Sequence, residues 1–230
     1  MLLYKGNIDL VLVPSGLAIM LIYHLFLLYR VLRRPEITSI GYENHNKLAW
    51  VRRMLQGTTE ETALALTVIS SSISASSNMA SLSIALSSLI GTWVGSTSKV
   101  FMTEVIYGDT TQSTSSVKYI ALLVCFLVSF TFFIHSARYF VHASYLMSMF
   151  DSDLPVGYVQ RAVIRGGNFW SLGLRALYFA TVLLMWIFGP IPMFLCSFFM
   201  VVVLYFLDSS SLPLHHHNFG KHPESGKESQ

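Results

Sequence analysis

A stretch of 37 residues that carries no charged side chain, Thr62 to Ser98, limits the possible folds more than any other feature. An α-helix rises about 1.5 Å per residue and needs about 20 residues to cross a bilayer, so this stretch is long enough to span one. Small polar residues recur in it at steps of three and four, interrupted in that register only by Ile84; they are Thr67, Ser70, Ser74, Ser77, Ser81 and Ser88. The pattern predicts a transmembrane helix with an apolar surface and a seam of these six residues, where another helix can approach closely.

The composition of the whole chain indicates several membrane spans rather than one large soluble core. Of the 230 residues, 53% are hydrophobic and only 12% are charged, whereas about 25% are charged in a typical soluble domain. Both cysteines, Cys125 and Cys196, lie in apolar stretches, which argues against a disulfide framework. The formal net charge of +3 is too small to suggest a nucleic-acid partner. We therefore expect an all-α, multi-pass transmembrane helical bundle in a lipid bilayer.

Five spans are expected from the apolar stretches, near residues 8–29, 63–94, 117–140, 172–188 and 193–207. The last two come from Leu172 to Leu207, which as one helix would be about 54 Å long, too long for a single crossing. Gly189, Pro190 and Pro192 interrupt this stretch, so we predict a short hairpin broken at Gly189–Pro192. One kinked helix followed by a buried half-helix is the alternative, and it would give four spans.

The segment between the first two spans is expected to lie at the membrane surface. Residues 43–56 form a basic amphipathic pattern with Trp50 at its flank, which predicts an interfacial helix. Gly57 should end this helix, and Thr58 or Thr59 can cap the next one.

Two further features are expected after the third span. The helical pattern continues beyond Ile134, with polar residues on one face near the membrane boundary. A short surface helix at 156–164 is then followed by a predicted turn at Gly166–Gly167, before the fourth span begins.

The distribution of basic residues predicts the orientation. In a five-span arrangement, twelve of the 15 lysines and arginines fall on one side of the membrane. By the positive-inside rule that side is cytoplasmic, so the N-terminus is expected outside or in a lumen and the C-terminus in the cytoplasm. Residues 208–230 show no sustained apolar period and are expected to form a disordered cytoplasmic tail. Whether the histidines of this tail bind metal is left open, and so is the organelle.

Three segments together resemble a known family. They are His45-Asn46 with Trp50-Val51 and Met54; Ala137-Arg138-Tyr139-Phe140; and Asn168-Phe169 with Gly173-Leu174-Arg175-Ala176, Tyr178-Phe179-Ala180, Trp186 and Pro190. This combination resembles the plant branch of domain-of-unknown-function family 599, a group of predicted multi-pass membrane proteins. The resemblance extends roughly from the first span to the fifth. It implies a multi-pass topology, and the family brings no known activity, substrate or cofactor.

Four arginines are the candidate site residues. Arg52 and Arg53 lie in the amphipathic helix, and Arg138 and Arg175 are expected at the cytoplasmic ends of spans. Guanidinium groups match the geometry of phosphate, so these residues could contact an anionic lipid headgroup or a small anion. The simpler interpretations, which we favour, are interfacial anchoring for Arg52 and Arg53 and, for Arg138 and Arg175, snorkelling to the surface or bonding to carbonyls at the end of a neighbouring helix.

The sequence favours a non-enzymatic role as a scaffold, an assembly factor or a lipid-associated membrane protein, with the seam available for a homo- or hetero-oligomer. A small oligomeric transporter or channel is the alternative, since polar residues of the second span could line a path. An intramembrane enzyme is least favoured, because the sequence shows no HExxH motif, no paired carboxylates and no nucleophile with a base at suitable spacing. No cofactor, metal site or nucleic-acid partner is expected.

Overall fold

The computed structural model describes residues 2–95, 112–149 and 155–209, which form six α-helices and one short 3-10 helix. These are α1 (Leu2–Arg33), η1 (Pro35–Ile37), α2 (Ser39–Gln56), α3 (Thr59–Gly95), α4 (Gln112–Ser148), α5 (Val156–Phe188) and α6 (Pro190–Asp208). Five of the α-helices, all except α2, are long and apolar enough to cross a membrane. The prediction of an all-α, multi-pass helical bundle is confirmed.

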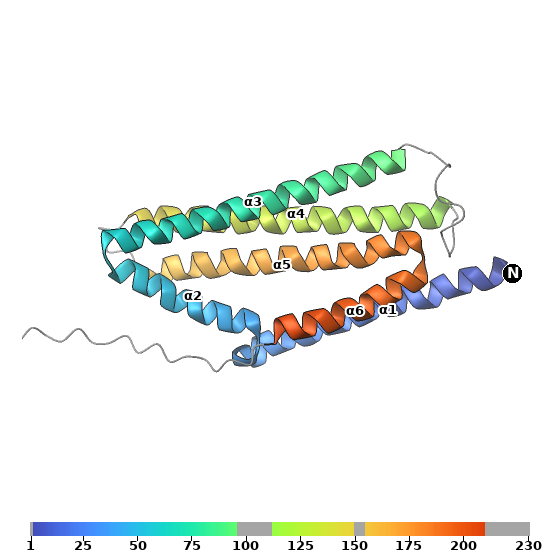
Figure 1. Cartoon of the computed structure of the whole chain (residues 1–230), viewed down its shortest axis with the longest axis horizontal. Coiled ribbons are helices and arrows are strands. Elements are labelled where there is room, and N and C mark those ends of the chain that lie inside the picture. The colour runs from blue at the N-terminus through green and yellow to red at the C-terminus, as the bar shows by residue number, and fades with distance from the viewer. Residues whose placement is uncertain (1, 96–111, 150–154, 210–230) are drawn as a thin grey trace, which may run out of the picture.

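Helices α3, α4 and α5 form an antiparallel frame that runs along the long axis of the molecule (Figure 1). Helix α6 packs on α5, and α1 packs on α6, but both stop well short of the end that the frame reaches. Beyond this point the shorter α2 packs on α5 and leads into the start of α3. We call these two parts of the molecule the α1/α6 half and the α2 half.

Each half has its own hydrophobic core. In the α1/α6 half, side chains from all five long helices meet; the buried ones include Val13, Met20, Ile90, Leu122, Phe126, Leu183, Trp186 and Met193. In the α2 half, side chains from α2, α3, α4 and α5 meet; they include Val51, Met54, Ala65, Ile69, Phe140, Ala143, Met147, Val159 and Val163. Burial of apolar surface therefore stabilises the same three-helix frame at two separate places.

The start of α2 and the junction between α2 and α3 follow local signals in the sequence. The Thr38 hydroxyl accepts a hydrogen bond from the Gly41 amide at 3.2 Å and so caps α2, which ends at Gly57. The Thr58 hydroxyl accepts from the Glu61 amide at 3.3 Å, and the Glu61 carboxylate accepts from the Thr58 amide at 2.9 Å. This reciprocal pair is a capping box. It confirms the predicted end of α2 and, of the two threonines considered, selects Thr58 as the cap of α3.

The predicted turn at Gly166–Gly167 is wrong, because α5 passes through both glycines as one continuous helix from Val156 to Phe188. The Phe140 ring lies against Gly166, where an added Cβ would be 3.0 Å from the ring. The Phe133 ring lies against Gly173 in the same way, with 2.8 Å to an added Cβ. These glycines are sites where α4 approaches α5 closely, and this packing overrides their low helix propensity.

The predicted break between the last two spans is confirmed. Gly189 has a φ of 141°, a conformation that favours glycine, and it separates α5 from α6. Pro190 and Pro192 then lie in the first turn of α6, where a proline needs no intrahelical partner for its missing N–H. The alternative of one kinked helix is therefore excluded.

The helices extend beyond several of the predicted spans. Helix α4 continues to Ser148, as the helical pattern after the third span predicted, and α5 begins 16 residues before the predicted fourth span. Asp208, expected in the tail, is the last residue of α6. The rest of the predicted tail, residues 210–230 with the histidine cluster, lies outside the described residues, as does the connection at 96–111.

Candidate functional site

At the end of α6, three side chains from three helices form a buried polar cluster, which we call the clasp. The Arg175 guanidinium from α5 binds the Asp208 carboxylate from α6 with two hydrogen bonds, Nη2 to Oδ1 at 2.6 Å and Nη1 to Oδ2 at 3.1 Å. The Tyr23 hydroxyl from α1 donates to Asp208 Oδ2 at 2.7 Å. The Arg175 and Asp208 side chains are only 14% and 10% exposed. A bidentate pair of this kind is strong and fixes the relative orientation of the helices that carry it.

The clasp continues into a set of contacts that tie the start of α2 to the end of α6. Thr38 is fully buried and pairs with Ser209 through an isolated backbone bridge. The Ser39 hydroxyl donates to the Leu207 carbonyl at 2.7 Å. The Arg30 guanidinium donates to the Ile37 carbonyl at 3.3 Å and thereby holds the turn between α1 and α2. The direction in which α2 leaves the bundle is thus set by contacts with α1 and α6.

The four predicted anion-contacting arginines do not share one environment. Arg175 lies inside the clasp, where Asp208 already neutralises its charge. The favoured interpretation was that Arg175 snorkels to the surface or bonds to helix-end carbonyls, whereas its partner in the structure is a carboxylate. Arg52, Arg53 and Arg138 are exposed on the surface of the α2 half, and Arg53 lies 3.9 Å from Glu61. A headgroup role for these three surface arginines stays a prediction.

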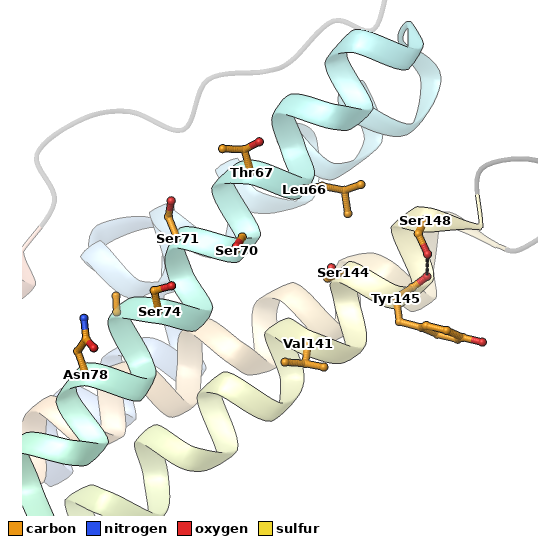
Figure 2. Close-up of a pocket in the computed structure, with 11 residues that line it drawn as sticks. Leu66, Thr67, Ser70, Ser71, Ser74, Asn78, Val141, Ser144, Tyr145 and Ser148 are labelled. Atoms are coloured by element: carbon orange, nitrogen blue, oxygen red, sulfur yellow. Dashed lines mark hydrogen bonds between the residues drawn. The ribbon is translucent and has the colours of Figure 1, made fainter.

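All six residues of the predicted seam are exposed, so the seam does not face another helix within the described chain. Helix α3 turns a different set of residues inward; these are Thr62, Ala65, Ile69, Ser76, Ala80, Ser83, Ser87 and Ile90. Figure 2 shows Thr67, Ser70 and Ser74 of the seam at one wall of an open groove between α3 and α4, with Ser144, Tyr145 and Ser148 at the other. The seam therefore stays a prediction about a partner outside this chain.

Two serine–serine–carbonyl chains, which we call rungs, cross the three-helix frame. In one, the hydroxyls of Ser76 and Ser136 lie 3.0 Å apart, and Ser136 donates to the Gly166 carbonyl at 2.8 Å. In the other, the Ser83 hydroxyl shares its proton between the Met79 carbonyl at 2.8 Å and the Ser129 hydroxyl at 3.3 Å, and Ser129 donates to the Gly173 carbonyl at 3.0 Å. Each residue has its counterpart seven positions away on the same helix, a spacing that the sequence analysis missed.

The α2 half also contains a cleft of about 520 Å³ between α2 and α3. Its lining is mainly apolar and aromatic; it consists of Trp50, Val68, Ile69, Ala75, Phe140, Val163, Gly167 and Trp170, with Glu43, Asn46, Lys47 and Ser72 as the polar members. A pocket of this size with a few polar groups is typical of a small-molecule site. The cleft is the candidate functional site.

One ion pair supplies most of the polarity of the cleft. The Lys47 ammonium lies 2.7 Å from the Glu43 carboxylate one helical turn away, and the two side chains are 21% and 59% exposed. Gly167 gives the ammonium room against α5, because a Cβ at that position would overlap the Lys47 Nζ atom. The cation is therefore mostly buried, while its counter-ion stands at the exposed rim.

The position of α2 keeps the cleft open. The Asn44 side-chain amide donates to the Asn168 carbonyl oxygen at 3.1 Å, and the Gln160 amide donates to the Leu48 backbone carbonyl at 2.8 Å. Both contacts hold α2 on α5. Contact with α3 is made close to the connecting turn, where the Thr62 hydroxyl donates to the Met54 carbonyl at 3.2 Å. The sequence predicted Trp50 at a bilayer surface and gave no indication of the cleft. Asn168 belongs to the third segment of the family resemblance, but its partner Asn44 lies 124 residues earlier in the chain.

Comparison with known proteins places the chain in a family. The family described as "Protein of unknown function, DUF599" matches residues 11–212, a range that contains the clasp, both rungs and the cleft. No curated protein and no solved structure matches the chain. Membership of the plant branch stays a prediction, because the match is to the family as a whole. From the first span to the end of the last, this chain belongs to the DUF599 family of proteins of unknown function.

Proposed function

We propose that this protein is a non-enzymatic membrane scaffold of the assembly or lipid-associated kind, in which the α1/α6 half is the anchor and the α2 half projects from the bilayer. The observation that carries the proposal is a difference in helix length. Helix α6 has 19 residues and is about 28 Å long, close to the roughly 30 Å of a bilayer core. Helices α3 and α4 have 37 residues each and are about 55 Å long.

The surfaces of the two halves support this position of the bilayer. On α1 and α6 the exposed side chains are mostly large and apolar; they include Leu21, Ile22, Leu25, Phe26, Leu195, Phe198, Phe199 and Phe206. On the α2 half, many exposed side chains are small and polar or basic; they include Thr67, Ser70, Ser74, Ser77, Arg52, Arg53, Arg138, Arg161 and Arg165. By the positive-inside rule, the α2 half is then cytoplasmic.

The seam supports a scaffold role because it is exposed. Small side chains let a second helix approach closely, and no helix of the described chain uses this face. A partner helix, from a second copy or from another protein, fits this surface. The described residues also contain no group of three His, Cys, Asp or Glu side chains that could hold a metal ion. The non-enzymatic role itself rests on the missing catalytic motifs of the sequence.

Cysteine labelling tests where the bilayer lies. Two seam serines form a matched pair, since Ser74 is in the α2 half and Ser88 in the α1/α6 half, and both are exposed. In a background with Cys125→Ala and Cys196→Ala, a membrane-impermeant maleimide should label Ser74→Cys and leave Ser88→Cys unlabelled. Labelling should occur only in vesicles whose cytoplasmic face is outward. Equal labelling of both positions would contradict the proposal that the α1/α6 half is the membrane anchor. Labelling of Ser74→Cys from the other face would contradict the proposed cytoplasmic position of the α2 half.

Assembly is tested by a substitution that blocks the seam. Ser74→Leu should leave the folded monomer intact, because Ser74 is exposed, and should abolish complexes seen on native gels in mild detergent. Thr131→Leu, an exposed position on α4, is the matched control and should leave the complexes unchanged. If wild-type protein and Ser74→Leu form the same complexes, the seam is not a partner surface.

A small oligomeric transporter is the second candidate. The observation in its favour is Asn78, an exposed amide that borders the groove of Figure 2 and could line a path between copies. Solute uptake into liposomes should then fall with Asn78→Leu. Uptake that is unaffected by this change would remove the main support for transport.

A further inference from the structure

We propose that the cleft between α2 and α3 binds a single-chain amphiphile with an anionic head, such as a long-chain carboxylate or a lysophosphate. In this assignment the Lys47 ammonium binds the head, and the aromatic lining covers the chain. The proposal goes beyond a scaffold role and does not depend on it, since it concerns a ligand of the α2 half and not a partner on the seam.

The shape of the cleft suits a chain. Its walls are three helical stretches of matching length, residues 43–50 of α2, 68–75 of α3 and 163–170 of α5. Each stretch covers about 10 Å along its helix, so the cleft is a slot about 10 Å long, which holds the part of a long chain that lies next to the head. Trp50, Phe140 and Trp170 supply large apolar surfaces in this slot, and burial of an aliphatic chain against them is favourable.

The polar end of the slot suits an anionic head. An ammonium group has three donors, and Glu43 is the one ion-pair partner of Lys47 within the part of the chain that the structure describes. Because the Glu43 side chain is 59% exposed, it can turn outward and leave the ammonium to a carboxylate or phosphate. The glycine at position 167 keeps this ammonium close to the α5 backbone and mostly out of water.

The surrounding charge favours the same sign of ligand. The lysines and arginines in the described part of the α2 half are Lys47, Arg52, Arg53, Arg138, Arg161 and Arg165, and the acidic residues there are Glu43, Glu60 and Glu61. The excess of positive charge attracts anions to this half of the molecule and raises their local concentration. A cationic or uncharged amphiphile gains nothing from this field.

The experiment uses the full chain in nanodiscs of neutral phosphatidylcholine and measures quenching of tryptophan fluorescence by dibromostearate. Trp50 and Trp170 line the cleft, so a bound brominated chain should quench them with saturable dependence on its concentration. The methyl ester of the same acid, which lacks the charge, should give only the non-saturable quenching that arises from partition into the bilayer. Inorganic phosphate should not compete at equal concentration, because it lacks the chain.

Two pairs of variants test the site. Lys47→Gln should weaken the saturable binding about tenfold or more, because a charge-assisted hydrogen bond is lost. Arg161→Gln removes one positive charge from the α2 half outside the cleft, so it controls for the surrounding field, and it should have little effect. Ser72→Leu should fill the slot and abolish saturable binding, whereas Ser71→Leu, the neighbouring serine outside the cleft, should not.

The outcomes decide the proposal. Saturable quenching that Lys47→Gln weakens and Arg161→Gln preserves supports it. Equal binding of acid and ester, equal effects of the two charge variants, or competition by inorganic phosphate alone would each overturn it. If Ser72→Leu does not fold, the comparison of Lys47→Gln with Arg161→Gln decides the question without it.

Discussion

The α1/α6 half and the α2 half use the same three helices and complete them differently. In the α2 half, α3, α4 and α5 meet through a serine rung and a phenylalanine placed over Gly166, and a second set of the same kind lies at Gly173, two residues before Arg175 of the clasp. The fourth side of the frame is covered by α6 with α1 in one half and by α2 in the other (Figure 1). The difference shows that the frame is a repeated structure, while the covering helices give each half its own surface and chemistry.

The change from one covering to the other occurs at the clasp. There, α6 ends at Asp208, which binds Arg175 of α5, and α2 begins next to it at Thr38 and Ser39. A loss of the clasp should therefore affect both halves. Changes in the frame should affect the half in which they lie, and changes at the exposed seam should affect neither.

The largest expected effect comes from Asp208→Ala. Removing the carboxylate leaves the Arg175 guanidinium mostly buried and without its counter-ion, which should lower the free energy of unfolding by about 3–5 kcal/mol. Denaturation by SDS from mild detergent micelles measures this loss. The double variant Arg175→Met with Asp208→Leu should recover most of it, and Tyr23→Phe should lose only about 1 kcal/mol. A stable Asp208→Ala single variant would show that the clasp does not hold the halves together.

A smaller effect is expected for Gly173→Ala. An added Cβ would meet the Phe133 ring at 2.8 Å, so overpacking should cost about 1–3 kcal/mol in the same assay. Gly91→Ala is the matched control, since nothing lies within 4 Å of its Cβ position, and it should be neutral or stabilise by up to about 1 kcal/mol. Equal effects at the two positions would argue against close packing of α4 on α5.

The two rungs allow a comparison of the frame inside the α2 half with the frame next to the clasp. Ser129→Ala and Ser136→Ala each remove a buried hydroxyl that donates to a glycine carbonyl, and each should cost about 1 kcal/mol. Similar losses would mean that both rungs are equally shielded from water. If Ser136→Ala costs nothing while Ser129→Ala costs the expected amount, water replaces the hydroxyl in the α2 half, and the interior of that half is more accessible to water than the frame next to the clasp.

The smallest effect is expected on the seam. Ser74→Ala should change the free energy of unfolding of the monomer by less than about 0.5 kcal/mol, because the side chain is exposed. The measurement is the same titration at low protein concentration. A loss of 1 kcal/mol or more would mean that the seam packs against something in the folded protein.

The features that the sequence predicted correctly depend on neighbours in the chain. The apolar stretches, the break at Gly189, the end of α2 at Gly57 and a threonine cap at 58 or 59 each involve residues within a few positions of one another. The turn predicted at Gly166–Gly167 was wrong because neighbours in the chain do not show why a glycine is needed there. The reason is the close approach of the Phe140 ring, which belongs to another helix.

The features that the sequence did not predict depend on residues far apart in the chain. Arg175 meets Asp208 after 33 residues, and Tyr23 meets the same carboxylate after 185. The seam is visible as a periodic pattern, but periodicity alone cannot say which face of α3 turns inward. The inward face carries its own small residues, including Ser76, Ala80 and Ser83. The cleft requires the angle at which α2 leaves the clasp, and no local pattern encodes that angle.

The spacing of the rungs has a mechanical consequence. Both rungs are satisfied in only one register of α4 against its neighbours, and a slide of three or four residues breaks both. The smallest slide that restores even one of them is seven residues, about 10 Å along the helix axis. The rungs therefore resist piston-like motion of α4. A force applied to the end of α4 is carried along the molecule by α3 and α5 as well.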